Sequence, residues 1–353
     1  MTKIVVSDID FEDTDLEQAL VEGAGIEFAR FQDRTPEGII RNAAGAQGII
    51  TSYGDFTAEV FEALPDLRVV SRTGVGYDSI DIAAATEHGV AVCNVPGYGT
   101  EVVSDHAITL ALACLRRINE LDRDIKAGVW DFARTRPLGQ CAGRVFGVVG
   151  MGEIGRAVAK KANGLGFKVV CWSRSLKPGR RTPEGYDILD YEELLRVSDV
   201  VSFNCALAPQ TRHMLDEERI ALMKPTAVVV NTSRGPVIDT WALARALEEE
   251  RLWGAGIDVF ETEPVEPDHP LLRAPHTVLS AHAAYWSEES ARELRRRATQ
   301  AAIDVVLTRH PADCLNPSVL KGVAEPGLLR SREAHVHLVR IASRRLAGQN
   351  PRL

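Results

Sequence analysis

The sequence predicts an α/β protein that contains two doubly wound parallel sheets. Residues 1–96 alternate short apolar runs with helical patterns, which is typical of a parallel sheet covered by helices on both faces. A second series of strands and helices starts at residue 144 and opens with a glycine-rich turn. The length of 353 residues also favours two domains over one.

The first series supplies four strands with helices between them. We expect strands at Lys3–Ser7, Gly48–Thr51, Arg68–Arg72 and Val90–Asn94, and helices at Asp15–Gly23, Pro36–Ala44, Ala58–Leu64 and Ile82–His88. Each strand is short and apolar, as parallel strands buried on both faces are. This region therefore forms an α/β unit of its own.

A long helix is predicted next, from near Thr100 to about Leu121, after Pro96 and Gly97 break the chain. It is apolar on almost every side, so it is buried either inside one subunit or at a large subunit interface. We favour the interface and expect a homodimer formed through the 100–121 helix and the second sheet domain.

The second series begins with a dinucleotide-binding fingerprint. Gly150, Gly152 and Gly155 form G-x-G-x-x-G between an apolar strand and a helical pattern, which is the context that this motif needs. The first glycine permits a tight turn, the second lets the backbone approach a pyrophosphate, and the third lets the helix lie close to the sheet. Glu153 and Ile154, inside the motif, are further candidate cofactor contacts.

The end of the next strand indicates which dinucleotide is bound. An acidic residue about 20 positions after the fingerprint normally binds the ribose hydroxyls of NAD. Cys171–Ser175 contains no acid, whereas Ser173 and Arg174 suit a 2′-phosphate. Further cations follow at Lys177, Arg180 and Arg181. We therefore favour NADP(H), with NAD(H) open, and the alternative is a basic loop exposed to solvent.

The remaining chain completes a second sheet of six or seven strands. Further strands are expected at Val200–Phe203, Ala227–Asn231, Gly254–Val259 and Val278–Ser280, with helices at Tyr191–Val197, Asp216–Met223 and Thr240–Glu250. A final helix at Glu288–Thr308 is long enough to reach back to the first series. Residues 318–353 are basic and poor in large apolar side chains, so we expect a loosely held tail.

Composition limits the classes of partner. A net charge of −8 argues against nucleic acid as a main partner. The sequence contains no window of about 18 uncharged apolar residues, so we expect no membrane span. The first ten residues do not resemble a signal peptide. The six cysteines form no C-x-x-C pair and lie mostly in apolar runs, which indicates a cytoplasmic protein with reduced thiols and no metal site.

Three polar residues follow strands of the second sheet: Arg234, Glu263 and His282. Ligands of such sheets bind beyond the carboxyl ends of the strands, so the three side chains can converge. Arg234 can hold a carboxylate and polarise the adjacent carbonyl. His282 can exchange a proton with the substrate oxygen, and Glu263 can orient and charge the imidazole. Any one of them alone is more often structural or solvated, so spacing does not decide between these alternatives.

Seven motifs carry a family resemblance. They are RTGVGYDSID (72–81), NVPGYGTEVVSDHA (94–107), GVVGMGEIG (147–155), DVVSFNCALAPQTRHML (199–215), VVVNTSRGPVID (228–239), GAGIDVFETEP (254–264) and SAHAAYWSE (280–288). From Gly74 to about Leu315 the chain resembles the D-2-hydroxyacid dehydrogenases. The 29- and 19-residue gaps that separate Arg234, Glu263 and His282 match the catalytic triad of that family.

The resemblance implies further site residues. Val75 and Gly76 would offer backbone N–H groups to the substrate carboxylate, with Arg72 beside them and Tyr285 also at the substrate. The implied cofactor contacts are Thr100, Pro209, Thr211, Thr232 and Asp258, the last with the nicotinamide carboxamide.

The resemblance also implies an activity and a domain order. A flavodoxin-like substrate domain (1–97 plus 289–317) would be discontinuous around a Rossmann cofactor domain (98–288), followed by the tail (318–353). The reaction would be reduction of a 2-oxo acid to a D-(R)-2-hydroxy acid. The substrate side chain is left open: Arg72, Arg134 and Arg136 suit a second anionic group, whereas Tyr98, Tyr285 and Trp286 suit an apolar one.

Two features depart from the common family pattern. Asn204 stands where the family often has histidine, at the adenosine end of the cofactor. Tyr285, three residues after His282, is similar to the aromatic residue of the C-terminal-binding corepressors. A dinucleotide-gated interaction or redox-sensor protein is therefore the alternative to a reductase.

Overall fold

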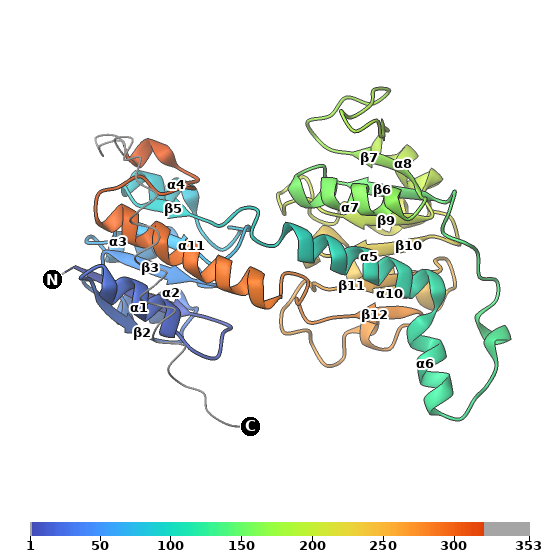
Figure 1. Cartoon of the computed structure of the whole chain (residues 1–353), viewed down its shortest axis with the longest axis horizontal. Helices are drawn as coiled ribbons and strands as arrows, with labels where there is room; N and C mark the ends of the chain where they lie inside the picture. The colour runs from blue at the N-terminus through green and yellow to red at the C-terminus, as the bar shows by residue number, and fades with distance from the viewer. Residues whose placement is uncertain (1, 321–353) are drawn as a thin grey trace, which may run out of the picture. The chain divides into compact units, whose positions relative to one another are not determined.

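The computed structural model describes residues 2–320 (Figure 1). Internal contacts divide this part of the chain into two units. The first contains residues 2–72, 79–93 and 299–320, and the second contains residues 73–78 and 94–298. Residues 321–353, most of the expected tail, lie outside the described residues, and no described helix is long and apolar enough to cross a membrane.

The unit boundaries differ from the predicted ones, which were placed after residues 97 and 288. The loop that ends at Asp78 groups with the second unit, because Asp78 pairs with Arg234 there (3.1 Å). Helix α11 (Glu288–Val306) is divided between the units. Its residue Arg297 donates a hydrogen bond to the carbonyl of Pro96 (2.8 Å), which ties its first half to the second unit.

The first unit holds a five-stranded parallel sheet of order β2-β1-β3-β4-β5. Its strands are β1 (Lys3–Asp8), β2 (Glu27–Arg30), β3 (Gly48–Thr51), β4 (Val69–Arg72) and β5 (Ala91–Cys93). Strand β2 is missing from the sequence-based prediction, because it is a partly exposed edge strand without an apolar run. The flavodoxin-like order confirms the predicted fold class of this unit.

Helices cover both faces of this sheet. They are α1 (Asp15–Gly23), α2 (Pro36–Asn42), α3 (Ala58–Ala63), α4 (Ile82–Glu87) and the second half of α11. Helices α2, α3 and α4 pack on one face, and α1 and α11 pack on the other. The free edge of β5 is covered by Asn316, whose side chain accepts from Val92 N (2.8 Å) and donates to Val90 O (2.9 Å).

The second unit holds a seven-stranded parallel sheet of order β12-β11-β10-β9-β6-β7-β8. Its strands are β6 (Val145–Val149), β7 (Lys168–Trp172), β8 (Asp187–Ile188), β9 (Val200–Phe203), β10 (Val228–Asn231), β11 (Gly254–Ile257) and β12 (Thr277–Leu279). The chain runs outward from β6 to β8 and then restarts on the other side of β6 at β9. Ligands of doubly wound sheets bind at such a switch point, here beyond the ends of β6 and β9.

The helices of the second unit also form two layers. They are α5 (Thr100–Arg116), α6 (Ile118–Lys126), α7 (Glu153–Gly164), α8 (Tyr191–Val197), α9 (Glu217–Ile220) and α10 (Thr240–Glu248), with short 3₁₀ turns η1 (Phe132–Thr135), η2 (Gly235–Val237) and η3 (Pro270–Leu272). A further 3₁₀ turn, η4 (Pro317–Leu320), belongs to the first unit. Helices α5 and α7 cover one face of the second sheet, and α8, α9 and α10 cover the other.

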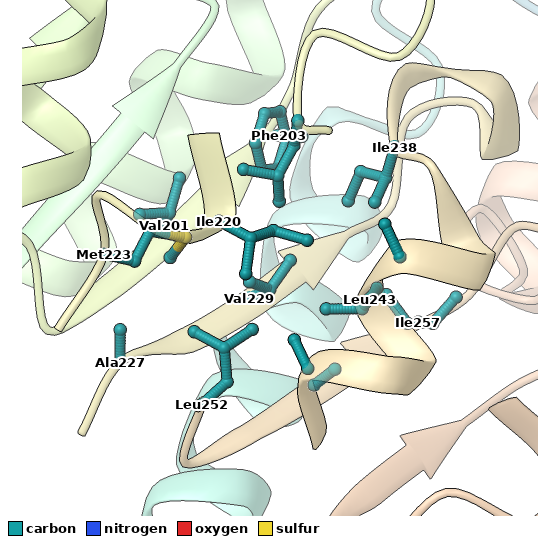
Figure 2. Packing of buried hydrophobic residues seen from close by; sticks show 14 of the residues in the cluster. Val201, Phe203, Ile220, Met223, Ala227, Val229, Ile238, Leu243, Leu252 and Ile257 are labelled. Atoms are coloured by element: carbon teal, nitrogen blue, oxygen red, sulfur yellow. The ribbon is translucent and has the colours of Figure 1, made fainter. Parts of the chain in front are cut away.

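The core on the α9–α10 face fixes the strand that leads to Arg234. Val229 of β10 packs among Ile220, Leu243 and Ile257, all fully or almost fully buried (Figure 2). Because close-packed side chains resist displacement, β10 ends at a defined point relative to its neighbours.

The single helix predicted over 100–121 is interrupted. Arg117 adopts a left-handed conformation (φ 53°), so α5 ends and α6 starts in a new direction. The Arg117 guanidinium lies 4.0 Å from the centre of the Trp253 ring and donates to Glu120, which stabilises the break. The apolar side chains of α5 are buried within its own unit. Helix α6, by contrast, has no buried residue and extends away from the sheet (Figure 1).

Candidate active site

The glycine turn after β6 forms a cradle that side chains would fill. Gly150 has a φ of 94° and donates its N–H to Trp172 O (2.8 Å). A Cβ atom on Gly155 would overlap the carbonyl oxygen of Gly150, so only glycine lets α7 start this close to the sheet. A Cβ on Gly152 would meet nothing within 4 Å, and the first turn of α7 is open there. An open helix N-terminus of this kind suits a phosphate.

Two buried polar atoms that follow neighbouring strands of this sheet have no partner among the described residues. They are Asn204 Oδ1, just after β9, and Thr232 Oγ1, just after β10. Buried oxygens of this kind almost always bond to something. Together with the glycine cradle, they fit a polar ligand such as a dinucleotide. Asn204 was treated only as a departure from the family pattern in the sequence, which gives no signal of burial.

Ser173 and Arg174 directly follow the strand that bonds to the glycine turn. Burial raises the pKa of the Cys205 thiol to about 11, and the Arg174 charge opposes this rise. Arg174 therefore lies near the end of β9 while its side chain remains exposed. Of the other cations predicted here, Arg181 pairs with Asp187 (2.7 Å).

The remaining candidate cofactor residues lie around the same switch point. Thr100 and Glu153 start α5 and α7, and their side-chain oxygens are 3.5 Å apart. Ile154 packs into the core between α5, α7 and the sheet. The hydroxyl of Thr211 donates to Ala206 O (2.8 Å) and shapes the loop that exposes Pro209. Their contacts with a cofactor stay predictions.

Glu263 and His282 form a close pair. His282 Nδ1 lies 2.6 Å from Glu263 Oε2, and the other carboxylate oxygen accepts the N–H of Phe260 (2.9 Å). Burial raises the pKa of Glu263, but the bonds from His282 and Phe260 and the charge of Arg234 outweigh it. The net pKa lies below the ordinary value, so Glu263 is ionised at neutral pH and holds the imidazole by one nitrogen.

Arg234 lies against the loop that the sequence assigned to the substrate carboxylate. Its Nε donates to Asp78 (3.1 Å), and a Cβ on Gly76 would overlap its Nη2. Since the Arg234 charge lowers the pKa of Glu263, the guanidinium is also close to the carboxylate–imidazole pair. The structure thus brings Arg234, Glu263 and His282 together. Asp78 was missed, although it lies inside the quoted motif RTGVGYDSID.

The loop beneath Arg234 is held from its own backbone. Val75 O accepts a hydrogen bond from Asn94 Nδ2 (2.7 Å), and Gly74 O accepts one from Val95 N (2.9 Å). Val75 is exposed, which leaves this edge accessible to a ligand. We retain Val75 and Gly76 as predicted substrate contacts.

His282 has a left-handed backbone (φ 52°) that Asp258 supports. The N–H of His282 donates to Asp258 O (2.7 Å), and the fully buried Asp258 carboxylate accepts the N–H groups of Ala283 (2.9 Å) and Ala284 (3.0 Å). Ser280 Oγ donates to it as well (2.6 Å). Asp258 therefore orients the histidine loop, and its expected contact with a carboxamide stays a prediction.

Aromatic side chains line one side of the imidazole. The Tyr285 ring stands edge-on to the His282 ring, with 6.0 Å between centroids, and Tyr98 lies 6.4 Å from Tyr285. Arg72 belongs to the first unit, where its Nε donates to Ser52 O (3.1 Å). Its contact with substrate, like that of Tyr285, stays a prediction.

The other two arginines considered for a second anion belong to the α6–η1 region. Arg134 pairs with Asp124 (3.1 Å), and the Arg136 guanidinium lies 5.2 Å from the centre of the Phe132 ring. Among the described residues, no cluster of His, Cys, Asp and Glu is placed to hold a metal ion.

Comparison with known proteins agrees with this geometry. A model described as D-isomer specific 2-hydroxyacid dehydrogenase, NAD binding domain, matches residues 108–284. A glyoxylate reductase from Korarchaeum cryptofilum is 40% identical over 294 residues, which are 82% of this chain and 88% of that protein.

Two solved structures are similar over almost their whole length. A glyoxylate reductase from Paecilomyes thermophila has a TM-score of 0.80 and 29% identity, covering 90% of this chain and 99% of the other. A D-lactate dehydrogenase from Aquifex aeolicus, complexed with NAD and lactic acid, has a TM-score of 0.79 and 25% identity, covering 91% and 98%.

Proposed function

The chain belongs to the D-isomer specific 2-hydroxyacid dehydrogenase family, and on this premise we propose that it reduces a small 2-oxo acid, such as glyoxylate, with NADPH. It is an oxidoreductase that interconverts 2-oxo and D-2-hydroxy acids with a nicotinamide dinucleotide. The observation that carries the proposed residue roles is the 2.6 Å pair of Glu263 and His282 beside the Arg234 guanidinium.

Arg234 and the neighbouring loop bind and polarise the substrate. The guanidinium offers paired N–H donors to the carboxylate and to the adjacent carbonyl oxygen, where negative charge develops. The backbone N–H groups of Val75 and Gly76, the predicted substrate contacts, would add further donors. Asp78 accepts a hydrogen bond from Arg234 Nε and so fixes the orientation of the guanidinium.

His282 supplies the proton. A nicotinamide dinucleotide, when bound, would supply the hydride for the carbonyl carbon. His282 donates the proton to the carbonyl oxygen, and Glu263 stabilises the imidazolium and holds its orientation through Nδ1. Asp258 keeps the histidine loop in its left-handed conformation.

Turnover assays test this assignment. NADPH and NADH consumption is measured with glyoxylate, hydroxypyruvate, phenylpyruvate and a phosphorylated 2-oxo acid. His282→Asn should lower kcat by about 10²–10⁴-fold, while His88→Asn, an exposed histidine of the first unit, should leave it unchanged. Wild-type turnover by His282→Asn would refute the role of His282.

The same panel decides the substrate side chain and the alternative function. If a second anion is bound through Arg72, Arg72→Ala raises KM for the phosphorylated acid and leaves KM for glyoxylate unchanged. Tight dinucleotide binding without turnover of any acid would favour an interaction or redox-sensor protein. The relatives described above are reductases and dehydrogenases, which does not favour that alternative.

NADPH is proposed as the preferred cofactor because of the β7 end. No acid stands at Cys171–Ser175, and the exposed Arg174 lies beside the switch point. Arg174→Ala should lower the ratio of kcat/KM for NADPH over NADH by about tenfold, as expected for a lost charged hydrogen bond. Arg181→Ala is the matched control, because that side chain pairs with Asp187. A wild-type enzyme that prefers NADH would overturn the proposal.

We propose a homodimer, as expected from the sequence, but with its interface at α6 and the segment after it, because the apolar side chains of α5, where the sequence placed the interface, are buried within their own unit. Ile118 and Ile125 of α6 are exposed, as are Trp130 (90%) and Phe132 (69%) of the adjoining segment. Exposed aromatic side chains in such a cluster usually mark an interface. Sedimentation analysis of the double variant Trp130→Ser and Phe132→Ser should show a monomer if a second copy covers them. The six free thiols support the further proposal that the protein works in a reducing compartment, the cytoplasm.

A further inference from the structure

A second carboxylate–imidazole pair lies next to the first. His213 Nε2 is 2.7 Å from Glu261 Oε2, and Glu261 stands two residues before Glu263 in the chain. Neither residue belongs to the proposed set of substrate or cofactor contacts. The pair is nevertheless attached to both backbone segments that carry the reacting side chains.

Glu261 is anchored on its other side by helix α10. Its Oε1 accepts hydrogen bonds from the N–H (3.1 Å) and hydroxyl (2.8 Å) of Thr240. His269 Nε2 lies 3.0 Å from the same hydroxyl, which already donates to Glu261, so this nitrogen is the donor. His269 Nδ1 correspondingly accepts the N–H of Leu271 (3.3 Å). Both Glu261 oxygens are therefore occupied by groups from different elements.

The charge state of this network follows from its surroundings. Burial raises the pKa of Glu261, but bonds from His213 and Thr240 outweigh burial and bring the net pKa below the ordinary value. Burial lowers the pKa of His269, against the charges of Glu261, Glu266 and Asp268. Glu261 is thus an anion at neutral pH, and His269 is a neutral donor.

His213 connects this network to the segment that follows Arg234. Its backbone N–H donates to Pro236 O (2.8 Å), while its side chain reaches Glu261. Gly235 lies so close to the Phe260 carbonyl that a Cβ there would overlap it. His213 therefore links the backbone that follows Arg234 to Glu261, which lies two residues before Glu263.

We propose that Glu261 and His213 are positioning residues that hold the Arg234 guanidinium and the Glu263–His282 pair in one geometry during the reduction. The inference rests on the roles proposed above for those three residues. Displacement of reacting groups by about 1 Å can slow an enzyme by about 100-fold. An ion pair as exposed as this one, with 39% of the His213 side chain accessible, contributes little to folding stability.

The test compares two substitutions of His213. His213→Ala should lower kcat for glyoxylate reduction by about tenfold or more, with KM for NADPH unchanged and the thermal midpoint shifted by less than about 2 °C. His213→Gln should restore most of kcat, because its amide N–H can donate to Glu261. With NADPH deuterated at the transferred position, the isotope effect on kcat should rise in His213→Ala, since the chemical step becomes slower.

Two further variants separate positioning from general loss of structure. Glu261→Gln keeps an acceptor for Thr240 but loses the negative charge, and should reproduce the fall in kcat. Glu217→Gln breaks the exposed pair with Arg245 (3.0 Å) in the same unit, and should leave kcat unchanged.

Each contrary outcome has a defined meaning. Wild-type kcat in both His213→Ala and Glu261→Gln would overturn the inference, as would a fall in kcat that matches a loss of folded protein and is not restored by His213→Gln. Wild-type turnover by His282→Asn would instead defeat the proposed function, whatever the result at residue 213.

Discussion

The two sheets have the same parallel construction, but the acids at their carboxyl edges are used differently. In the first unit the buried Asp8 carboxylate accepts the Thr51 hydroxyl (2.6 Å) and the N–H groups of Ser52 (3.2 Å) and Tyr53 (2.7 Å). In the second unit Glu263 accepts one N–H and holds an imidazole. The first acid closes its own loop and also pairs with Arg34 (3.4 Å), whereas the second supports a group that can exchange a proton.

The role of an acid at the carboxyl edge of a sheet therefore depends on the partners that the topology brings to it. An acid saturated by amides of a neighbouring loop stabilises that loop. An acid that faces a histidine orients the imidazole and gives it a negatively charged neighbour. Substitutions at the two edges should therefore affect different quantities: stability in the first unit and turnover in the second.

The largest effect is expected at the edge of the second sheet. Arg234→Ala should lower kcat/KM for 2-oxo acid reduction by roughly 10³-fold, because both carboxylate binding and carbonyl polarisation are lost. The unfolding midpoint in urea should change little. If stability fell and kcat/KM per folded enzyme did not, the division between the two edges would be wrong.

The matching substitution in the first unit is Asp8→Ala. It leaves the Thr51 hydroxyl and the Tyr53 N–H without their acceptor, so unfolding free energy should fall by about 2–3 kcal/mol. Urea denaturation measures this loss. Asp10→Ala, which removes an exposed partner of Arg34, is the control and should cost less than about 1 kcal/mol.

Glu263→Gln should have an intermediate effect on turnover. Without the carboxylate, His282 Nδ1 loses the charged acceptor that orients the ring, so kcat at neutral pH should fall by about tenfold. Steady-state rates check this, and a wild-type kcat would mean that the carboxylate does not act on His282.

Acid should have the smallest effect, through carboxylates of the second unit. The pKa values of Glu120, Glu261 and Glu263 lie below the ordinary value of 4.5. Their contribution to stability is complete above that value and is lost as pH falls through the folded-state pKa. Unfolding free energy should drop on acidification below pH 4.5, by less than about 1 kcal/mol for each partly exposed group. Glu120→Gln should reduce this drop.

The sequence was sufficient for regular, buried elements. Both parallel sheets were predicted and are confirmed, because their strands are unbroken apolar runs bounded by turns. The sequence did not predict the edge strands β2 and β8 or the point where the helix over 100–121 is interrupted. Strand β8 has two residues, and the α5–α6 break uses a left-handed arginine where a glycine or proline would have been the readable signal.

The site divides in the same way. The glycine turn is local and readable, and the gaps between Arg234, Glu263 and His282 were interpretable through the family resemblance. Asp78 is 156 residues from Arg234, and His213 is 48 residues from Glu261. No periodic pattern marks such long-range polar pairs, so only three-dimensional contacts show them.

The left-handed backbone at His282 has a consequence for laboratory evolution of this enzyme. A side chain at positive φ is disfavoured by about 1 kcal/mol relative to glycine, so His282→Gly should relax the peptide and give a protein that resists heat better than His282→Ala. Among substitutions of this histidine, selection for thermal stability alone would then favour glycine over alanine, and either one removes the proton donor. Screens for variants of higher thermal stability should therefore also measure turnover in every round.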